Sequence, residues 1–193
     1  MNARHLAPIF VACLLSAAFA RAQPGAAALN ALPSLDVASY MGTWYQVAWI
    51  PNRFQKQCVS DTTATYRDRG DGTVEVLNRC KLTNGGIDDV LGVARPVAGV
   101  SRVESGKLMP ARLEVSFLPS WLRWAGIGWG AYWLVDLPAD GRYAIVSEAS
   151  REYLWVLARQ PALTPAEDAA VKAKLQSLGF DIARIQTHPH GGR

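Results

Sequence analysis

Histidine is nearly missing from this chain, which has three among its 193 residues. His5 lies close to the start, and His188 and His190 lie close to the end, so the long stretch between them has none. That stretch therefore lacks the most common general base of enzymes and one of the usual zinc ligands. No serine lies near a histidine base, and no cluster of metal ligands is visible in the sequence. These absences weigh against an enzyme and predict a protein that needs no metal or cofactor.

Basic clusters and long apolar runs are missing as well. Of the 20 basic residues, Arg4 and Arg21 lie in an expected leader; without them 18 basic residues face 16 acidic ones, a net charge of +2. No basic block carries interleaved aromatic residues, so nucleic acid is not an expected partner. The apolar stretch from Leu6 to Phe19 is too short to span a bilayer. Its basic start and the small residues after it predict a signal peptide over residues 1–22.

The leader leaves two readings open. Cleavage would release an exported protein into the periplasm or leave it at the outer membrane. The run Phe10-Val11-Ala12-Cys13 faintly resembles a bacterial lipobox, which would place a lipid on Cys13. The apolar run continues beyond that cysteine, which favours cleavage of the leader over lipid attachment. Residues 23–33, rich in Ala, Pro and Gly, then predict a loose linker.

Once the leader is removed, Cys58 and Cys80 are the remaining cysteines. Residues 59–66 and 73–80 read as two strands around a turn-rich hexapeptide. If the turn centres near Arg69, the two cysteines lie opposite each other across the hairpin, where a disulfide can form. An oxidising compartment favours that bond, which would close a loop of about 20 residues and add roughly 3 kcal/mol of stability. A metal-binding pair is the alternative, but no third or fourth ligand is nearby.

Short strand-like runs joined by turns make up most of the chain. In one of them Leu113, Val115 and Phe117 alternate with polar residues, as in a half-buried strand. About eight such runs follow one another without interleaved helices, which favours an antiparallel sandwich or an up-and-down barrel. One helix is predicted near the end, over residues 165–178, because Thr164-Pro165-Ala166-Glu167 forms a capping box. Residues 188–193, with both late histidines, predict a flexible, solvated tail.

Three stretches together carry a family resemblance. Gly42-Thr43-Trp44 opens the first strand, Tyr132-Trp133-Leu134-Val135-Asp136 begins a later strand pair, and Arg159 closes the last long strand just before the capped helix. In these features the chain resembles the lipocalin family over residues 34–187, above all its bacterial outer-membrane (Blc) branch and the related apolipoprotein D. The resemblance implies an all-β fold, an eight-stranded antiparallel up-and-down β-barrel with one C-terminal helix packed outside. It also implies that Trp44 packs at the closed end with Arg159 stacked across it, and that Gly42 has a structural role.

The resemblance further implies a set of ligand contacts. Tyr66, Asn78, Phe117 and Trp155 match positions that line the pocket in the family. Strand alternation adds four more residues to this predicted inner wall: Tyr132, Tyr153, Val115 and Leu134. The same residues could instead fill the barrel as a packed core, and alternation alone does not separate the two.

The function that follows is binding and transport or storage of a small hydrophobic ligand, a fatty acid or lysophospholipid, in the bacterial cell envelope. No reaction is needed for it. The alternative is a filled barrel that acts as a structural or membrane-interaction protein through its Trp-rich loop, residues 119–130. There Trp121 and Trp124 flank Arg123, which suits a membrane surface, although the loop could equally fold back over its own barrel. An enzyme on the same scaffold has little support.

Overall fold

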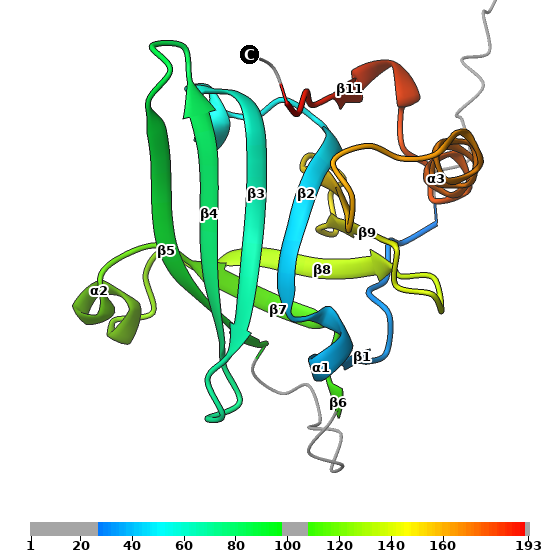
Figure 1. Ribbon diagram of the computed structural model, residues 1–193. Helices are drawn as coiled ribbons and strands as arrows, with labels where there is room; N and C mark the ends of the chain where they lie inside the picture. The colour runs from blue at the N-terminus through cyan, green and yellow to red at the C-terminus, as the bar shows by residue number, and fades with distance from the viewer. Residues whose placement is uncertain (1–26, 98–107, 192–193) are drawn as a thin grey trace, which may run out of the picture.

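The computed structural model describes residues 27–97 and 108–191. The predicted signal peptide and Cys13 lie outside the described residues. Within them, eight strands follow one another around a closed antiparallel barrel, and the last of the ring pairs with the first (Figure 1). The strands of the barrel are β2 (Gly42–Trp49), β3 (Cys58–Asp68), β4 (Val74–Leu82), β5 (Ile87–Pro96), β7 (Arg112–Ser116), β8 (Gly130–Asp136), β9 (Tyr143–Ser147) and β10 (Leu154–Ala158). The predicted up-and-down barrel is confirmed.

Short elements occupy the connections. At one end, a small sheet of β1 (Leu35–Asp36) and β6 (Leu108–Met109) lies beside the one-turn helix α1 (Val37–Tyr40) (Figure 1). The β2–β3 connection contains the one-turn helix η1 (Arg53–Gln55). The remaining elements are α2 (Ser120–Trp124), α3 (Pro165–Ser177), η2 (Ile182–Arg184) and β11 (Gln186–Thr187).

Helix α3 packs outside the barrel, as predicted. The apolar residues therefore form two cores, one between α3 and the barrel wall and one inside the barrel. The helix begins with the predicted capping box, in which Thr164 and Glu167 satisfy each other's backbone N–H groups. Val171 and Leu175 turn toward the outer face of the barrel and are buried there. A separate cluster, which includes Trp44, fills part of the barrel interior. Strand alternation thus gives β9 and β10 two buried faces, one toward each core.

The predicted loose linker is wrong for its described part, residues 27–33. Leu29 is only 4% exposed and packs in the core beneath α3. The backbone N–H of Leu32 donates to the carbonyl of Leu134 at 2.8 Å. The prediction rested on the Ala- and Pro-rich composition and overlooked two leucines, Leu29 and Leu32. Their contacts with the barrel hold the segment in place.

The predicted solvated tail is wrong for residues 188–191. Strand β2 pairs with β3 only from Gly42 to Tyr45, so beyond that point one edge of β2 needs another partner. The chain end supplies it: β11 pairs with β2, and the N–H of His188 donates to the carbonyl of Val47 at 2.9 Å.

The side chain of His188 is correspondingly buried, with 7% of its surface exposed. Its Nε2 shares a 2.7 Å hydrogen bond with the hydroxyl of Thr62, and its ring meets Trp49 edge-on. The tail is further held by His190, whose Nε2 lies 2.9 Å from the carbonyl oxygen of Gln46. The end of the chain therefore completes the barrel wall.

Acidification should loosen this wall segment. Burial and the neighbouring His190 lower the pKa of the His188 imidazole, so the folded state favours the neutral ring. Its contribution to stability is present above the unfolded value of about 6.5 and is lost as the pH falls through the lower folded value. We expect the Tm to fall between about pH 7.5 and about pH 5, and His188→Gln to remove part of that fall. Identical Tm-against-pH curves for the two proteins would contradict this assignment.

The predicted disulfide between Cys58 and Cys80 is present, with the two Cα atoms 5.5 Å apart. The route to it differs from the predicted hairpin. Pairing of Asp68 with Val74 centres the turn on Asp71 rather than Arg69. Two register shifts in β3 bring Cys58 back toward Cys80 despite the displaced turn. A bulge adds residues to one strand only and so changes which residues face each other.

Candidate functional site

The closed end of the barrel is built around Trp44. Its side chain is fully buried, and its indole N–H donates to the carbonyl of Tyr40 at 2.8 Å. The guanidinium of Arg159 lies 3.7 Å from the centroid of the indole ring, in the predicted stacking arrangement. Arg159 also donates to the carbonyls of Thr43 and Ser39, at 3.1 and 2.6 Å. One side chain therefore joins β10, the start of β2 and helix α1.

Gly42 lies beneath this arginine in a conformation with φ of 91°. A side chain at that position would be strained, and its Cβ would lie 3.6 Å from a guanidinium nitrogen of Arg159. Glycine is favoured here by its backbone conformation rather than by lack of space, because 3.6 Å is an ordinary contact distance.

A chain of three phenols lies inside the barrel next to Trp44. The hydroxyl oxygen of Tyr132 is 2.7 Å from that of Tyr40 and 2.8 Å from that of Tyr66. Burial raises the pKa of Tyr66 to about 12 and holds the pKa values of Tyr40 and Tyr132 well above their usual range. All three phenols therefore stay protonated near neutral pH. Two contacts use two of the three hydroxyl protons, which leaves one for another acceptor.

The walls of the interior are apolar. Val115 and Phe117 pack against the interior cluster, and Leu134 is buried within it. The ring of Phe117 lies directly on Gly92, where a Cβ would come within 2.5 Å of a ring carbon. Asn78 shares the inward side of β4 with Val74 and Val76 by alternation.

The opposite end of the barrel carries a run of aromatic rings. Trp155 stacks with Tyr153 at 6.0 Å between centroids, and Tyr153 meets Phe54 of η1 at 5.6 Å. A cleft of about 480 Å³ lies at this rim, lined by Pro51, Asn52, Arg53, Glu152, Tyr153 and Arg184. The rings thus lead from a surface cleft at η1 toward the interior cluster that Trp155 contacts.

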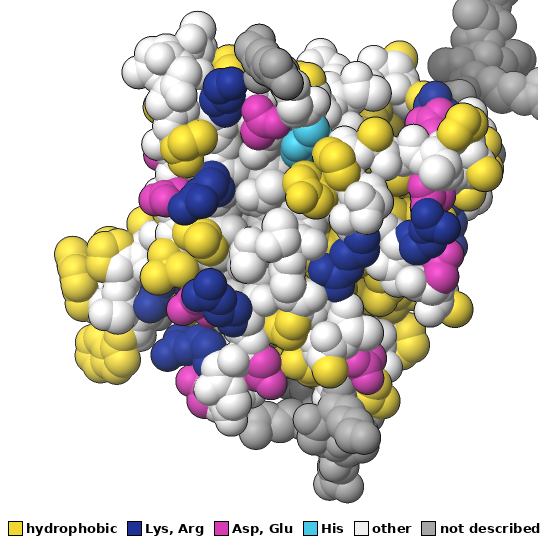
Figure 2. Space-filling view, in the orientation of Figure 1, with side chains coloured by type: hydrophobic (Ala, Val, Ile, Leu, Met, Phe, Trp, Pro, Cys, Tyr) yellow, Lys and Arg dark blue, Asp and Glu magenta, His cyan; other side chains and the backbone are white. Residues whose placement is uncertain are grey.

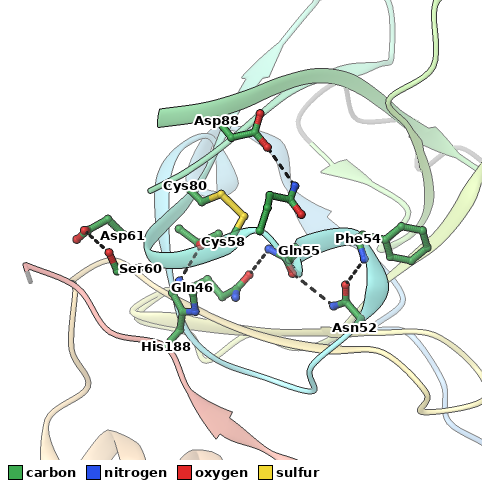
Figure 3. The surroundings of a disulfide bond; sticks show 12 residues. Gln46, Asn52, Phe54, Gln55, Cys58, Ser60, Asp61, Cys80, Asp88 and His188 are labelled. Carbon is green, nitrogen blue, oxygen red and sulfur yellow. Dashed lines mark hydrogen bonds between the residues drawn. A yellow bond between two sulfur atoms is a disulfide. The ribbon is translucent and has the colours of Figure 1, made fainter. Parts of the chain in front are cut away.

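A polar bridge beside these rings joins η1 to the neighbouring strands β2 and β10; its contact between Gln55 and Gln46 is drawn in Figure 3. The amide of Gln55 donates from Nε2 to Oε1 of Gln46 at 2.9 Å. Its own Oε1 accepts the indole N–H of Trp155 at 2.8 Å. The disulfide lies close to this bridge, because Cys58 begins β3 immediately after the η1 connection. Gln55 therefore ties the connection to both β2 and β10.

The predicted contact residues fall into two groups by burial. Tyr66 and Leu134 are buried with Trp44, whereas the others retain part of their exposure. The partly exposed set is Asn78, Val115, Phe117, Tyr132, Tyr153 and Trp155. Trp155 and Tyr153 are the partly exposed members beside η1, whereas Tyr132 retains part of its exposure next to Tyr40 and Tyr66.

Sequence reasoning missed Tyr40, Phe54 and Gln55. Tyr40 has a detectable signal, since Asp36 caps the one-turn helix that carries it. Phe54 and Gln55 lie in an irregular connection with no periodic pattern, so the sequence holds no comparable signal for them.

Few polar side chains are fully buried in the part of the chain that the structure describes. Among the described residues, the buried polar or charged side chains are Gln46, Ser60, Thr62, Ser116, Ser147 and His188. This set contains no Lys, Arg, Asp or Glu. Within residues 27–97 and 108–191, no group of three His, Cys, Asp or Glu side chains could hold a metal ion.

The Trp-rich loop packs on the barrel through one tryptophan and exposes two. Trp129 lies under the guanidinium of Arg95, 3.8 Å from ring centroid to cation, and its indole N–H donates to the carbonyl of Arg123. Trp121 and Trp124 on α2 are 69% and 91% exposed. Figure 2 shows hydrophobic side chains gathered on this projecting element with basic side chains beside them.

Comparison with known proteins places these features in a family. The family model of the lipocalin-like domain matches residues 35–190. A lipocalin of Acanthamoeba polyphaga mimivirus is 36% identical over 79% of this chain and 83% of its own length. The outer membrane lipoprotein Blc of Escherichia coli (strain K12) is 30% identical over 79% of this chain and 77% of its own. Apolipoprotein D of Mus musculus is 30% identical over 80% and 76%.

Solved structures agree on the fold. Lobster apocrustacyanin A1 superposes with a TM-score of 0.61 at 15% identity, covering 81% of this chain and 80% of the other. The family match spans the whole barrel, from β1 to the tail segment that completes its wall. The chain belongs to the lipocalin family.

Proposed function

We propose that this lipocalin binds one single-chain lipid, a fatty acid or lysophospholipid, inside the η1 end of its barrel and carries or stores it in the bacterial cell envelope. The observation that carries the proposal is the gradient of burial along the inner wall, from Trp44, which is fully buried, to Trp155, which is partly exposed. An apolar wall open at one end can bury an alkyl chain, at about 0.8 kcal/mol per CH₂ group.

The expected location rests on the relatives. Blc is named as an outer membrane lipoprotein, which supports export of this chain. Among the described residues, no helix is both long and apolar enough to cross a membrane.

Removing Trp155 should weaken lipid binding by about tenfold, because its ring forms part of the wall and also fixes Gln55. The measurement is displacement of the neutral dye phenylnaphthylamine by dodecanoate and by a lysophosphatidylcholine. Trp124→Ala is the matched control for Trp155→Ala, because it removes the same ring from the exposed α2. Equal affinities in the two variants would contradict a site at Trp155.

A second candidate function is docking on a membrane surface through loop 119–130. The exposure of Trp121 and Trp124 beside Arg123 favours it, since indole rings settle at the interface between lipid and water.

Replacing Trp121 and Trp124 together with Ser should reduce cosedimentation with vesicles of phosphatidylcholine and phosphatidylglycerol by about tenfold. Ile87→Ser, at another exposed apolar position, is the control and should leave sedimentation unchanged. Vesicle binding that survives the double substitution would refute docking through this loop.

A further inference from the structure

The amide of Gln46 is the one place in the described residues where a buried side-chain nitrogen or oxygen has no hydrogen-bond partner. Its side chain is 3% exposed, and the unpartnered atom is Nε2. A buried donor without an acceptor is costly to a fold, so one that persists indicates a group that something else satisfies.

The identity of the free atom follows from the chemistry of its neighbours. The indole N–H of Trp155 can only donate, so the atom of Gln55 that it meets at 2.8 Å must be the oxygen. Gln55 then donates from Nε2 to Gln46 at 2.9 Å, so the atom of Gln46 that accepts must be its oxygen, Oε1. The indole N–H of Trp155 thus fixes the orientation of both amides. Nε2 of Gln46 is then the donor without an acceptor. Figure 3 shows the two glutamines meeting in this way.

The free donor lies among the residues of the proposed binding site. Gln46 follows Trp44 on the same side of β2, and its register partner on the neighbouring strand β10 is Leu157 of the interior cluster. Its amide meets Gln55, which in turn accepts from Trp155 of the aromatic run.

The surroundings select what this donor can bind. No Lys or Arg is among the buried side chains of the described residues. The lowered pKa of the buried His188 imidazole keeps that ring neutral near pH 7. Arg53 and Arg184 line the surface cleft, not the buried position of Gln46. A carboxylate brought to Gln46 would therefore lose its water without gaining a buried cation, whereas an ester, amide or ketone carbonyl is already neutral.

From this geometry we infer that Gln46 Nε2 donates to a neutral carbonyl of the bound lipid, so that the site prefers an acyl ester to a free fatty acid. The inference rests on the proposed function and chooses between its two ligands. A lysophospholipid has such an ester at the junction of its chain and its head group, whereas a fatty acid has a carboxylate there.

The test compares three ligands of similar chain length in displacement of phenylnaphthylamine from the full chain: methyl decanoate, decanoate and undecane. Wild-type protein should bind methyl decanoate about tenfold more tightly than either of the others near neutral pH. Gln46→Met removes the donor, so it should lower affinity for the ester to that for undecane and leave undecane binding unchanged. The Tm should change little, because the variant removes the unpartnered donor but also the oxygen that accepts from Gln55 Nε2, and Gln55 is only partly buried.

Gln55→Glu provides an independent variant that leaves Gln46 in place. A carboxylate there can still accept from Trp155 but can no longer donate, so the Gln46 amide should turn and donate its Nε2 to that carboxylate. The preference for ester over undecane should again disappear. Both of these ligands are neutral, so neither carries a net charge that the added carboxylate would repel.

An ester-to-undecane affinity ratio that is unchanged in both variants would overturn the inference, as would equal wild-type affinity for decanoate and methyl decanoate. In either case the proposed function would still stand. It would fail, and the inference with it, if the wild-type protein bound neither the dye nor any of the three ligands.

Discussion

Trp44→Ala should destabilise the protein by about 3–5 kcal/mol, the usual cost of truncating a fully buried tryptophan. The change leaves a cavity where β2 meets α1, and it strands the carbonyl of Tyr40 that the indole N–H satisfied at 2.8 Å. It also removes the ring beneath Arg159. Urea unfolding at equilibrium measures the loss, and a change below about 1 kcal/mol would contradict the central place of Trp44 in the closed end.

Arg159→Ala tests the other half of the same contact. The stacked guanidinium and its two carbonyl partners should contribute about 1–3 kcal/mol, less than the indole because the arginine is partly exposed. Affinity for a lipid should change little, since Arg159 lies at the end of the barrel away from η1. A variant with wild-type Tm and weakened binding would reverse these roles.

Removing the disulfide should have the next largest effect. Cys58 and Cys80 are 22 residues apart, and on the loop-entropy model the bond contributes about 3 kcal/mol. The double variant Cys58→Ala with Cys80→Ala should therefore unfold at lower urea concentration with an unchanged slope. Helix η1 ends at Gln55, three residues before Cys58, so ligand affinity should fall as well.

A comparison isolates the bond from the volume of its sulfur atoms. Wild-type protein treated with a reductant keeps both sulfur atoms but loses the cross-link, and it should match the double variant. Equal stability of the oxidised and reduced protein would show that the bond adds nothing.

The closed end was predicted through the family resemblance, because Gly42-Thr43-Trp44 and Arg159 match motifs of that family. Trp44 and Arg159 each stand at a fixed place relative to a strand end, and alternation then orients the residues that follow them. The same rule placed Val115, Phe117 and Trp155 against the interior, where the structure has them. Whether they contact a ligand is a separate matter that alternation does not address.

Other features depend on irregularities that local pattern does not encode. The cysteine pairing needed register shifts in β3, one of them beside Asp61, whose φ of 55° is unusual for a non-glycine residue. The tail was wrongly predicted because its burial depends on β2 and β3 diverging after Tyr45, a long-range consequence of barrel closure. Gln55 depends on the course of an irregular connection and on an indole contributed by a strand 100 residues later.

The central claim is that the η1 end of the barrel holds one single-chain lipid, and native mass spectrometry of the protein titrated with an acyl lipid tests it most directly. The account predicts one lipid per chain for the wild-type protein and for Trp124→Ala, and a large loss of the bound form for Trp155→Ala with the fold intact. A protein that takes up no lipid, or a Trp155→Ala variant that keeps its lipid as well as the wild type does, would contradict it.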